Sequence, residues 1–337
     1  MRHIVLGAVA CVAALTTVAA GQAPDLVPAR YTAIVTAYRS GSGGAVGEIA
    51  AWTRADIERA LPVAAAGGTL FAEAAAMLHT EAAVAAAATD WARGSVHLGA
   101  AEALLRSLPA STEDFSERYY AFIPTLFLAH GDPDSARLWV ERGLRLFQYS
   151  APIRTASGMI EELVAHLGDP ECVGRECAAG RNGTLAGARL AAAEREYRIA
   201  LERDPAFLEA RLRLGRVLAL QGNERDANVA LAAVTENGSP RLRYLAHLFR
   251  GAIAVGGADV ATARREYAAA MTALPGCQTP YLALSQIEEA AGNLPRGRDL
   301  VSQVARLGND AVADPWWTYQ NGGLDRDTLQ WLIDYVR

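Results

Sequence analysis

The sequence contains no lysine, and all 32 of its basic residues are arginine. A lysine Schiff base and the lysine of a phosphate-binding loop are therefore excluded. The formal net charge is −5, and the arginines form no basic block. Nucleic acids bind to clustered positive charge, so the charge pattern predicts a protein without a nucleic-acid partner.

Aromatic residues are scarce as well, at 7 %, and long alternating runs of valine, isoleucine and threonine are few. Alanine, the strongest helix former, supplies 70 of the 337 residues. Because 51 % of the residues are apolar and only 20 % are charged, a disordered chain is excluded. The composition predicts an all-α protein, and the length favours two domains or an elongated repeat array.

The first twenty residues have the pattern of a targeting segment. Arg2 and His3 precede an apolar stretch that ends in the small residues Val18-Ala19-Ala20. A basic start, an apolar middle and a small-residue end predict a signal peptide at 1–20, cleaved during export to the periplasm or the extracellular space. An uncleaved anchor, the alternative, would be the chain's only contact with a membrane, although the stretch is slightly short for a span of about 20 residues.

Of the four cysteines, Cys11 lies in the signal segment and the other three lie downstream. Cys172 and Cys177 bracket one short loop, and an exported protein meets an oxidising compartment, so we predict a disulfide between them. Cys277 has no partner in this scheme. A single pair of cysteines with four residues between them does not make a zinc site, and no metal or cofactor is predicted.

Two segments of the second half share one spacing of alanine, tyrosine and proline. In each segment the alanines and the tyrosine lie on one face of a helix that ends before the proline. Another helix pair separates them, with Leu214-Gly215 inside its first helix and Gly222-Asn223 between its helices. The period is 34 to 36 residues, with two antiparallel helices in each unit. The matching residues are Ala193, Tyr197, Ala200 and Pro205, and Ala263, Tyr267, Ala270 and Pro275.

This pattern resembles the tetratricopeptide repeat family, which places an aromatic residue and Leu-Gly on the first helix and alanine, an aromatic residue and proline on the second. The resemblance implies an α-solenoid of antiparallel helix pairs, a right-handed superhelix in which neighbouring units bury each other's apolar faces. An irregular helical bundle is the alternative. The units span 117–150, 151–205 with an insertion that holds the loop cysteines, 208–241, 244–277 and 278–311, which together make up the repeat region 117–311.

The regions on either side of the repeats lack a clear frame. We interpret 21–110 as degenerate helix hairpins that continue the stack, with a separate helical domain as the alternative. The segment 312–337 contains the aromatic run DPWWTYQNGG and an amphipathic helix, which we expect to cap the last unit. Helices of the first region are expected at 27–39, 45–60, 69–92 and 95–107.

Sequence motifs of enzymes are missing, including GxSxG, HExxH and the nucleotide-binding loops. His79, two residues before Glu81, is the most enzyme-like fragment. Two positions apart on a helix, these side chains point about 200° apart, which favours a buried histidine. We therefore predict a protein that is not an enzyme, and an unrecognised enzyme with a site near His79 is the alternative.

In the family that this chain resembles, inward-facing residues of the first helices bind extended peptides or partner helices. The resemblance thus implies a non-enzymatic interaction scaffold or adaptor that binds a protein partner in its concave groove. The alternative ligand is a glycan or another small molecule that stacks on Trp316 and Trp317. The groove positions in this sequence are Arg118, Thr125, Met159, Glu162, Leu212, Arg216, Leu248, Val255, Gln286 and Glu289.

Overall fold

The computed structural model describes residues 25–87, 90–108, 113–129, 131–167, 185–307, 314–320 and 326–337. Within these ranges the regular structure is helical and contains no strand, which confirms the all-α prediction. None of the described helices is long and apolar enough to cross a membrane. The predicted signal peptide at 1–20 and the predicted Cys172–Cys177 disulfide lie outside the described residues.

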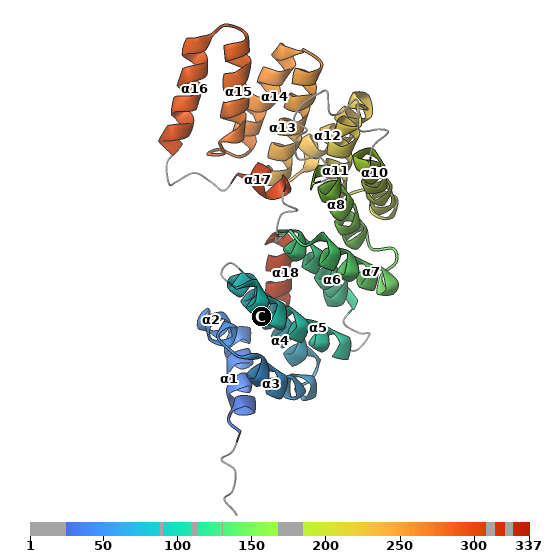
Figure 1. Ribbon diagram of the computed structural model, residues 1–337, viewed down its shortest axis with the longest axis vertical. Helices are drawn as coiled ribbons and strands as arrows, with labels where there is room; N and C mark the ends of the chain where they lie inside the picture. Colours follow the sequence, from blue (N-terminus) through green and yellow to red (C-terminus); the bar gives the residue numbers. More distant parts are fainter. Residues whose placement is uncertain are drawn as a thin grey trace, which may run out of the picture.

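Five antiparallel helix pairs stack along the long axis of the molecule (Figure 1). Each helix packs against the other member of its pair, and among the first helices α6 packs against α8, α8 against α11, and α11 against α13. We call the face formed by these first helices the inner face. The pairs are α6 (Glu113–Ala129) with α7 (Pro133–Leu146), α8 (Ala151–Leu167) with α10 (Leu185–Arg203), α11 (Leu208–Leu220) with α12 (Glu224–Asn237), α13 (Pro240–Gly256) with α14 (Val260–Ala273), and α15 (Thr279–Ala290) with α16 (Leu294–Leu307).

Glycine in a first helix faces a large residue in the second helix of the same pair. A Cβ atom added at Gly251 would lie 2.7 Å from the Tyr267 ring, and one at Gly215 would lie 2.6 Å from Cγ of Leu231. The two helices therefore approach closely where they cross, and the large side chain fills the space that glycine leaves. This contact is the physical basis of the repeated spacing in the sequence.

The turn inside a pair also repeats. Gly222 ends the first helix of its pair with a φ of +84°, and Asn223 then caps α12 by accepting a hydrogen bond from the backbone NH of Asp226. Gly131 and Asp132 play the same two roles before α7. Glycine tolerates positive φ without steric cost, and asparagine or aspartate satisfies a free amide at the helix start.

The N-terminal region is helical too, but one expected helix is wrong. Residues 45–60 do not form a single helix. Thr53 begins a new helix by accepting a hydrogen bond from the Asp56 backbone NH, while the Asp56 carboxylate accepts one from the Thr53 NH. This capping box divides the segment. The observed helices are α1 (Val27–Arg39), α2 (Gly44–Ala50), α3 (Arg54–Ala66), α4 (Thr69–Ala87) and α5 (Trp91–Ser107).

One continuous apolar cluster joins this N-terminal region to the first repeat pairs. Its fully or almost fully buried members include Tyr31 of α1, Leu104 of α5, Phe122 of α6 and Ile160 of α8. The N-terminal helices and the first repeat pairs therefore share a core.

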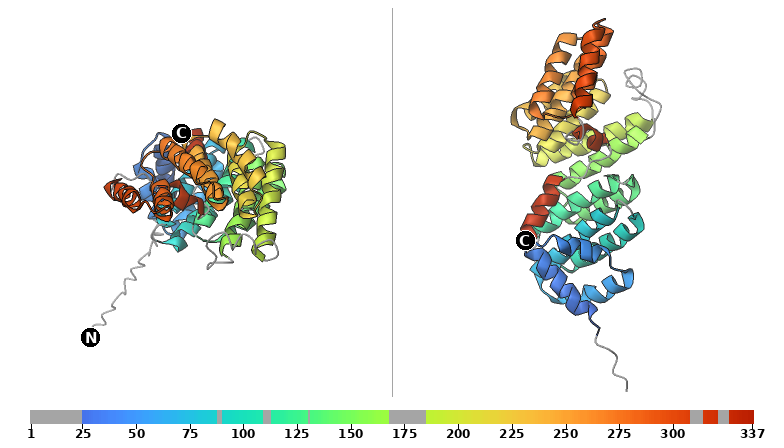
Figure 2. Two further views of the ribbon diagram at one scale, coloured as in Figure 1. Left: turned by 90° about the horizontal axis from the view of Figure 1, so that it is seen from above. Right: turned by 90° about the vertical axis from the view of Figure 1, so that its left-hand side faces the viewer.

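The C-terminal segment does not cap the last pair, contrary to expectation. Figure 1 and Figure 2 show α18 (Arg326–Val336) beside α6 and far from α16, and the contacts of α18 are with α4 and α6. Its aromatic side chains have partners on α6, because the Arg118 guanidinium lies 4.0 Å from the centre of the Trp331 ring and Phe115 packs beside Tyr335. Among the described residues, Val301 on α16 stays 45 % exposed.

Candidate binding site on the inner face

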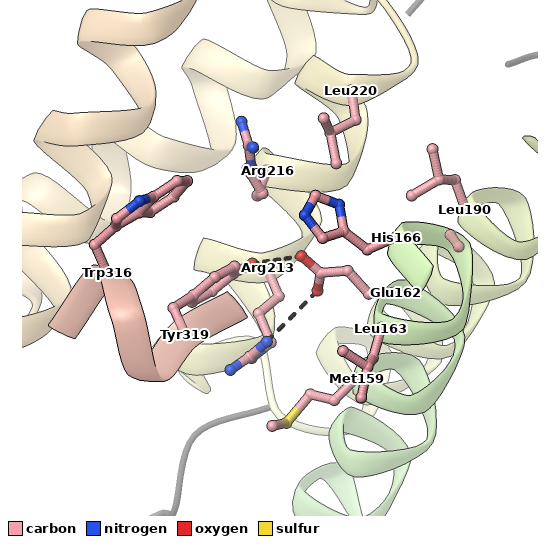
Figure 3. A pocket seen from close by; sticks show the side chains of 11 residues that line it. Met159, Glu162, Leu163, His166, Leu190, Arg213, Arg216, Leu220, Trp316 and Tyr319 are labelled. Carbon is pink, nitrogen blue, oxygen red and sulfur yellow. Dashed lines mark hydrogen bonds and ion pairs between the residues drawn. The ribbon is translucent and has the colours of Figure 1, made fainter. Parts of the chain in front are cut away.

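A recess that is partly open to solvent lies on the inner face where α8 and α11 meet the short helix α17 (Pro315–Gln320). Figure 3 shows the side chains around it, with Trp316 and Tyr319 of α17 opposite the residues of α8. Its lining is Met159, Glu162, Leu163, Ala165 and His166 from α8, Leu190 from α10, Arg213, Arg216 and Leu220 from α11, and Trp316 and Tyr319 from α17.

Arg213 is the buried positive charge at the floor of this site, with 4 % of its side chain exposed. Its Nε donates to Glu209 at 2.8 Å, and its Nη1 lies 3.5 Å from Glu162. Burial acts to raise the pKa of Glu209, but the positive charges of Arg241 and Arg213 outweigh burial and hold that pKa below its usual range. The charge of Arg213 is thus matched by carboxylates within the site.

Glu162 accepts hydrogen bonds from two tyrosine hydroxyls at the edge of the recess. Its Oε2 accepts a hydrogen bond of 2.8 Å from Tyr197 of α10, and its Oε1 accepts one of 2.7 Å from Tyr319 of α17. Burial, reinforced by the negative charge of Glu162, raises the pKa of both tyrosines well above the usual value. Both hydroxyls therefore stay protonated at physiological pH and act as donors to the carboxylate.

Aromatic rings surround Arg216 on the opposite side. Its guanidinium carbon lies 5.1 Å from the centre of the Phe249 ring and 5.5 Å from that of Trp316. The Trp316 and Tyr319 rings are parallel to within 3°, with their centres 6.5 Å apart. A guanidinium against aromatic faces gains cation–π attraction while it presents donors to the recess.

Asp314 fixes the start of α17 on the inner face. Its Oδ1 accepts a hydrogen bond of 2.7 Å from the Tyr244 hydroxyl of α13, and its Oδ2 accepts bonds from the Thr279 backbone NH and hydroxyl at the start of α15. Only 5 % of Asp314 is exposed. Side chains from four repeat pairs thus hold the segment 314–320.

The structure brings three of the ten predicted groove residues together in the recess, namely Met159, Glu162 and Arg216. Val255, Gln286 and Glu289 are exposed but lie outside the recess lining. Arg118 lies under Trp331 of α18.

For three other residues the prediction of a groove position is wrong, because their side chains are buried. Thr125, Leu212 and Leu248 are at most 4 % exposed and offer no surface to a partner. Leu212 and Leu248 pack in one cluster because the first helices α11 and α13 touch each other directly. Positions that would face a groove in a wider superhelix are therefore core positions in this one.

Several residues of the site were not among the sequence predictions, and those that make its polar and aromatic contacts include Arg213, Phe249, Asp314 and Tyr319. An arginine inside the apolar run LRLGRVL was the one local signal for Arg213. No local pattern indicates that Asp314 and Tyr319 pack on helices far upstream, since their partners are up to 157 positions away.

The alternative site near His79 is a closed network. His79 and His97 are both fully buried, and their Nδ1 atoms share a hydrogen bond of 3.0 Å. Nε2 of His79 shares another with the Tyr31 hydroxyl at 3.0 Å. Burial, followed by the neighbouring His97, lowers the pKa of His79 to about 3, so its ring is neutral. Neither ring is accessible to a substrate, which agrees with a packing role.

Glu81 is also bound to side chains of this chain, because it accepts a hydrogen bond from Tyr38 and lies 3.9 Å from the guanidinium of Arg337. The part of the chain that the structure describes holds no group of three His, Cys, Asp or Glu side chains suited to a metal ion.

No family model and no curated protein sequence matches this chain. Among solved structures, one titled "Functional Characterization of Pseudomonas Aeruginosa pilF" is similar, with a TM-score of 0.47 and 15 % sequence identity. The alignment covers 66 % of this chain and 90 % of that chain. Nothing about the site follows from this likeness.

Proposed function

We propose that this protein is a non-enzymatic interaction scaffold that binds a segment of a protein partner on its inner face. The observation that carries the proposal is the position of the short helix α17 on that face. It is held there by a cation–π contact of Trp316 and by hydrogen bonds of Tyr319 and of the preceding Asp314. A surface that already holds one helical segment of its own chain has the chemistry to hold another. The resemblance to tetratricopeptide repeats favours the same function.

The recess beside α17 supplies the place for a partner side chain. Its walls combine the apolar side chains of Met159, Leu163 and Leu220 with the charged groups of Glu162 and Arg216. Protein interfaces concentrate binding energy where an apolar or aromatic anchor enters such a pocket and a charged group fixes its orientation.

The test is selection of binding peptides from a displayed random library with the full-length protein, followed by fluorescence anisotropy. We expect Arg216→Ala to weaken the selected peptides roughly tenfold or more, as for a hot-spot arginine. Arg225→Ala, on the exposed surface of α12, is the matched control and should bind like wild type. Failure to recover any peptide would contradict the proposal, and so would equal affinity of the wild type and the two variants.

A second candidate is a glycan or small-molecule binder, and the observation that favours it is the aromatic wall of Trp316 and Tyr319 in the recess. A sugar ring stacks on such surfaces. Saturable binding on a glycan array, lost in Trp316→Ala, would support this candidate over a peptide partner.

We also propose that the protein is exported and that its partner lies in the periplasm or outside the cell, on the strength of the pattern at 1–20. The intact mass of protein recovered outside the cytoplasm tests this. A mass that retains the first twenty residues would refute cleavage and favour an anchor.

A further inference from the structure

Three side chains of the segment 314–320 make its polar and aromatic contacts with the repeats. Asp314 accepts hydrogen bonds from α13 and α15, Trp316 packs edge-on against Phe249, and Tyr319 donates to Glu162 and lies under Arg213. The anchors therefore stand at relative positions 0, +2 and +5.

Trp317, between the second and third anchors, behaves differently. Its side chain is 55 % exposed, whereas Asp314 and Tyr319 are both 5 % exposed. The inner face thus contacts side chains at particular positions of the segment, and aromatic character alone does not bring a side chain into contact. Trp316 and Trp317 form a matched pair in which only the first packs on Phe249.

Two of the anchors, Asp314 and Tyr319, meet polar groups that complement them. The negative Asp314 caps the start of α15, where free backbone NH groups favour an anion. The phenol of Tyr319 donates a hydrogen bond to the Glu162 carboxylate, and its ring lies 4.4 Å from the guanidinium carbon of Arg213. A segment without these groups would leave Glu162 with one donor fewer and Tyr244 without its acceptor, which disfavours other sequences.

We propose that 314–320 is an internal ligand of the inner face, and that the partner is a short helical peptide with an acidic residue, an aromatic residue two positions later and a tyrosine three positions after that, which displaces α17. This inference rests on the proposed function. The recess decides the competition, because it lies beside α17 and a partner can place a small apolar side chain between Met159 and Leu220.

The internal segment also sets how tightly a partner must bind. A segment of the same chain competes at an effective concentration on the order of millimolar, so a free peptide of the same sequence competes poorly at micromolar concentration. A partner that fills the recess as well overcomes this disadvantage. The inner face would then reject weak sequences and admit those that contain both the anchors and the extra side chain.

The first test uses a fluorescein-labelled peptide with the sequence of residues 313–320, ADPWWTYQ, titrated with the full-length protein. We expect Trp316→Ala/Tyr319→Ala protein, in which α17 has lost two anchors, to bind the peptide at least tenfold more tightly than wild type does. In the peptide, Trp316→Ala should weaken binding to this variant at least tenfold, and Trp317→Ala should leave it unchanged. Equal affinity of variant and wild-type protein, or equal loss from the two tryptophan changes, would overturn the inference.

The second test needs no variant that risks misfolding. Peptides selected from the library are added in saturating amounts to the wild-type protein, and hydrogen exchange is followed in 314–320. We expect exchange there to accelerate at least tenfold, because the peptide displaces α17. Peptides that bind without this change overturn the internal-ligand inference and leave the scaffold function standing, whereas a library that yields no binder overturns both.

Discussion

The hydroxyl of Tyr319 donates a hydrogen bond of 2.7 Å to Glu162, a residue 157 positions earlier in the sequence. The same carboxylate accepts from Tyr197 and lies beside the guanidinium of Arg213. One side chain of α8 therefore ties together α10, α11 and α17. In a partly buried network such as this one, the loss of one member affects the remaining members as well.

Tyr319→Phe removes that hydrogen bond while it keeps the ring. Hydrogen bonds to charged groups contribute about 1.5–3 kcal/mol, so we expect the free energy of unfolding in urea to fall by about 2 kcal/mol. Trp317→Ala, at an exposed position of the same helix, should change it by less than about 0.5 kcal/mol. Equal effects of the two substitutions would contradict the described docking of α17.

Gly251→Ala tests the close contact inside a helix pair. The added Cβ would lie 2.7 Å from the Tyr267 ring, so the ring or the helix must shift. Such overpacking costs about 1–3 kcal/mol, which exceeds the roughly 1 kcal/mol that alanine gains over glycine within a helix. We expect a lower melting temperature.

The control for Gly251→Ala is Gly99→Ala. Gly99 lies within α5, and a Cβ there would meet no atom within 4 Å. Only the gain in helix propensity remains, so this variant should melt at a higher temperature than wild type. Destabilisation by both changes would mean that the glycines serve something other than close packing.

The buried carboxyl group of Glu73 should make the stability of the folded protein depend on pH. It is 1 % exposed, neither carboxylate oxygen has a hydrogen-bond partner among the described residues, and burial raises its pKa. The folded protein therefore holds this proton more tightly than the unfolded chain does. The stability that Glu73 contributes is fully present below the unfolded pKa and is lost as pH rises through the higher folded pKa.

Glu73→Gln should remove this loss. We expect the variant to melt at a higher temperature than wild type at pH 7, because the neutral amide does not lose a proton there. The difference should shrink as the pH falls below the unfolded pKa of Glu73. A difference independent of pH would show that the carboxylate is not the cause.

Cys277 should be unreactive in the folded protein. Its side chain is buried, and burial, followed by the negative charge of Asp314, raises the pKa of its thiol to about 11. Maleimide should therefore label it only after unfolding, since the thiolate is the reactive form.

The same thiol reports the docking of α17. Cys277 shares an apolar cluster with Tyr319, against which Trp316 also packs, so Trp316→Ala should accelerate its labelling while Trp317→Ala should not. Mass analysis without reductant adds a test of the predicted Cys172–Cys177 disulfide, because labelling of all cysteines after unfolding would refute it.

The sequence predicted those parts of the fold that short-range rules govern. The Gly251–Tyr267 contact lies within one helix pair, and the turn at Gly222-Asn223 is local, so both leave a pattern in neighbouring residues. The helix break at Thr53 also has a local signal, which is a threonine followed three residues later by an aspartate. The prediction of one helix over 45–60 did not use this signal.

The candidate site was predicted only in part, for a physical reason. Whether an inward residue is exposed depends on how tightly adjacent first helices pack, and this spacing buries Leu212 while it leaves Met159 at the recess. The docking of α18 on α4 and α6 is set by tertiary shape, and the amphipathic pattern of that helix shows only that it must dock somewhere.

The position of α18 has a consequence for how the protein is made. Leu332, Ile333 and Val336 belong to the same core cluster as Tyr31 and Phe122, so the core of the half that leaves the ribosome first contains side chains translated after all five helix pairs. Domains generally fold as units during synthesis, N-terminal first. During elongation the N-terminal half therefore lacks these core side chains, and the apolar surface of α4 and α6 that α18 contacts is uncovered. This surface can be covered only after α18 has been synthesised.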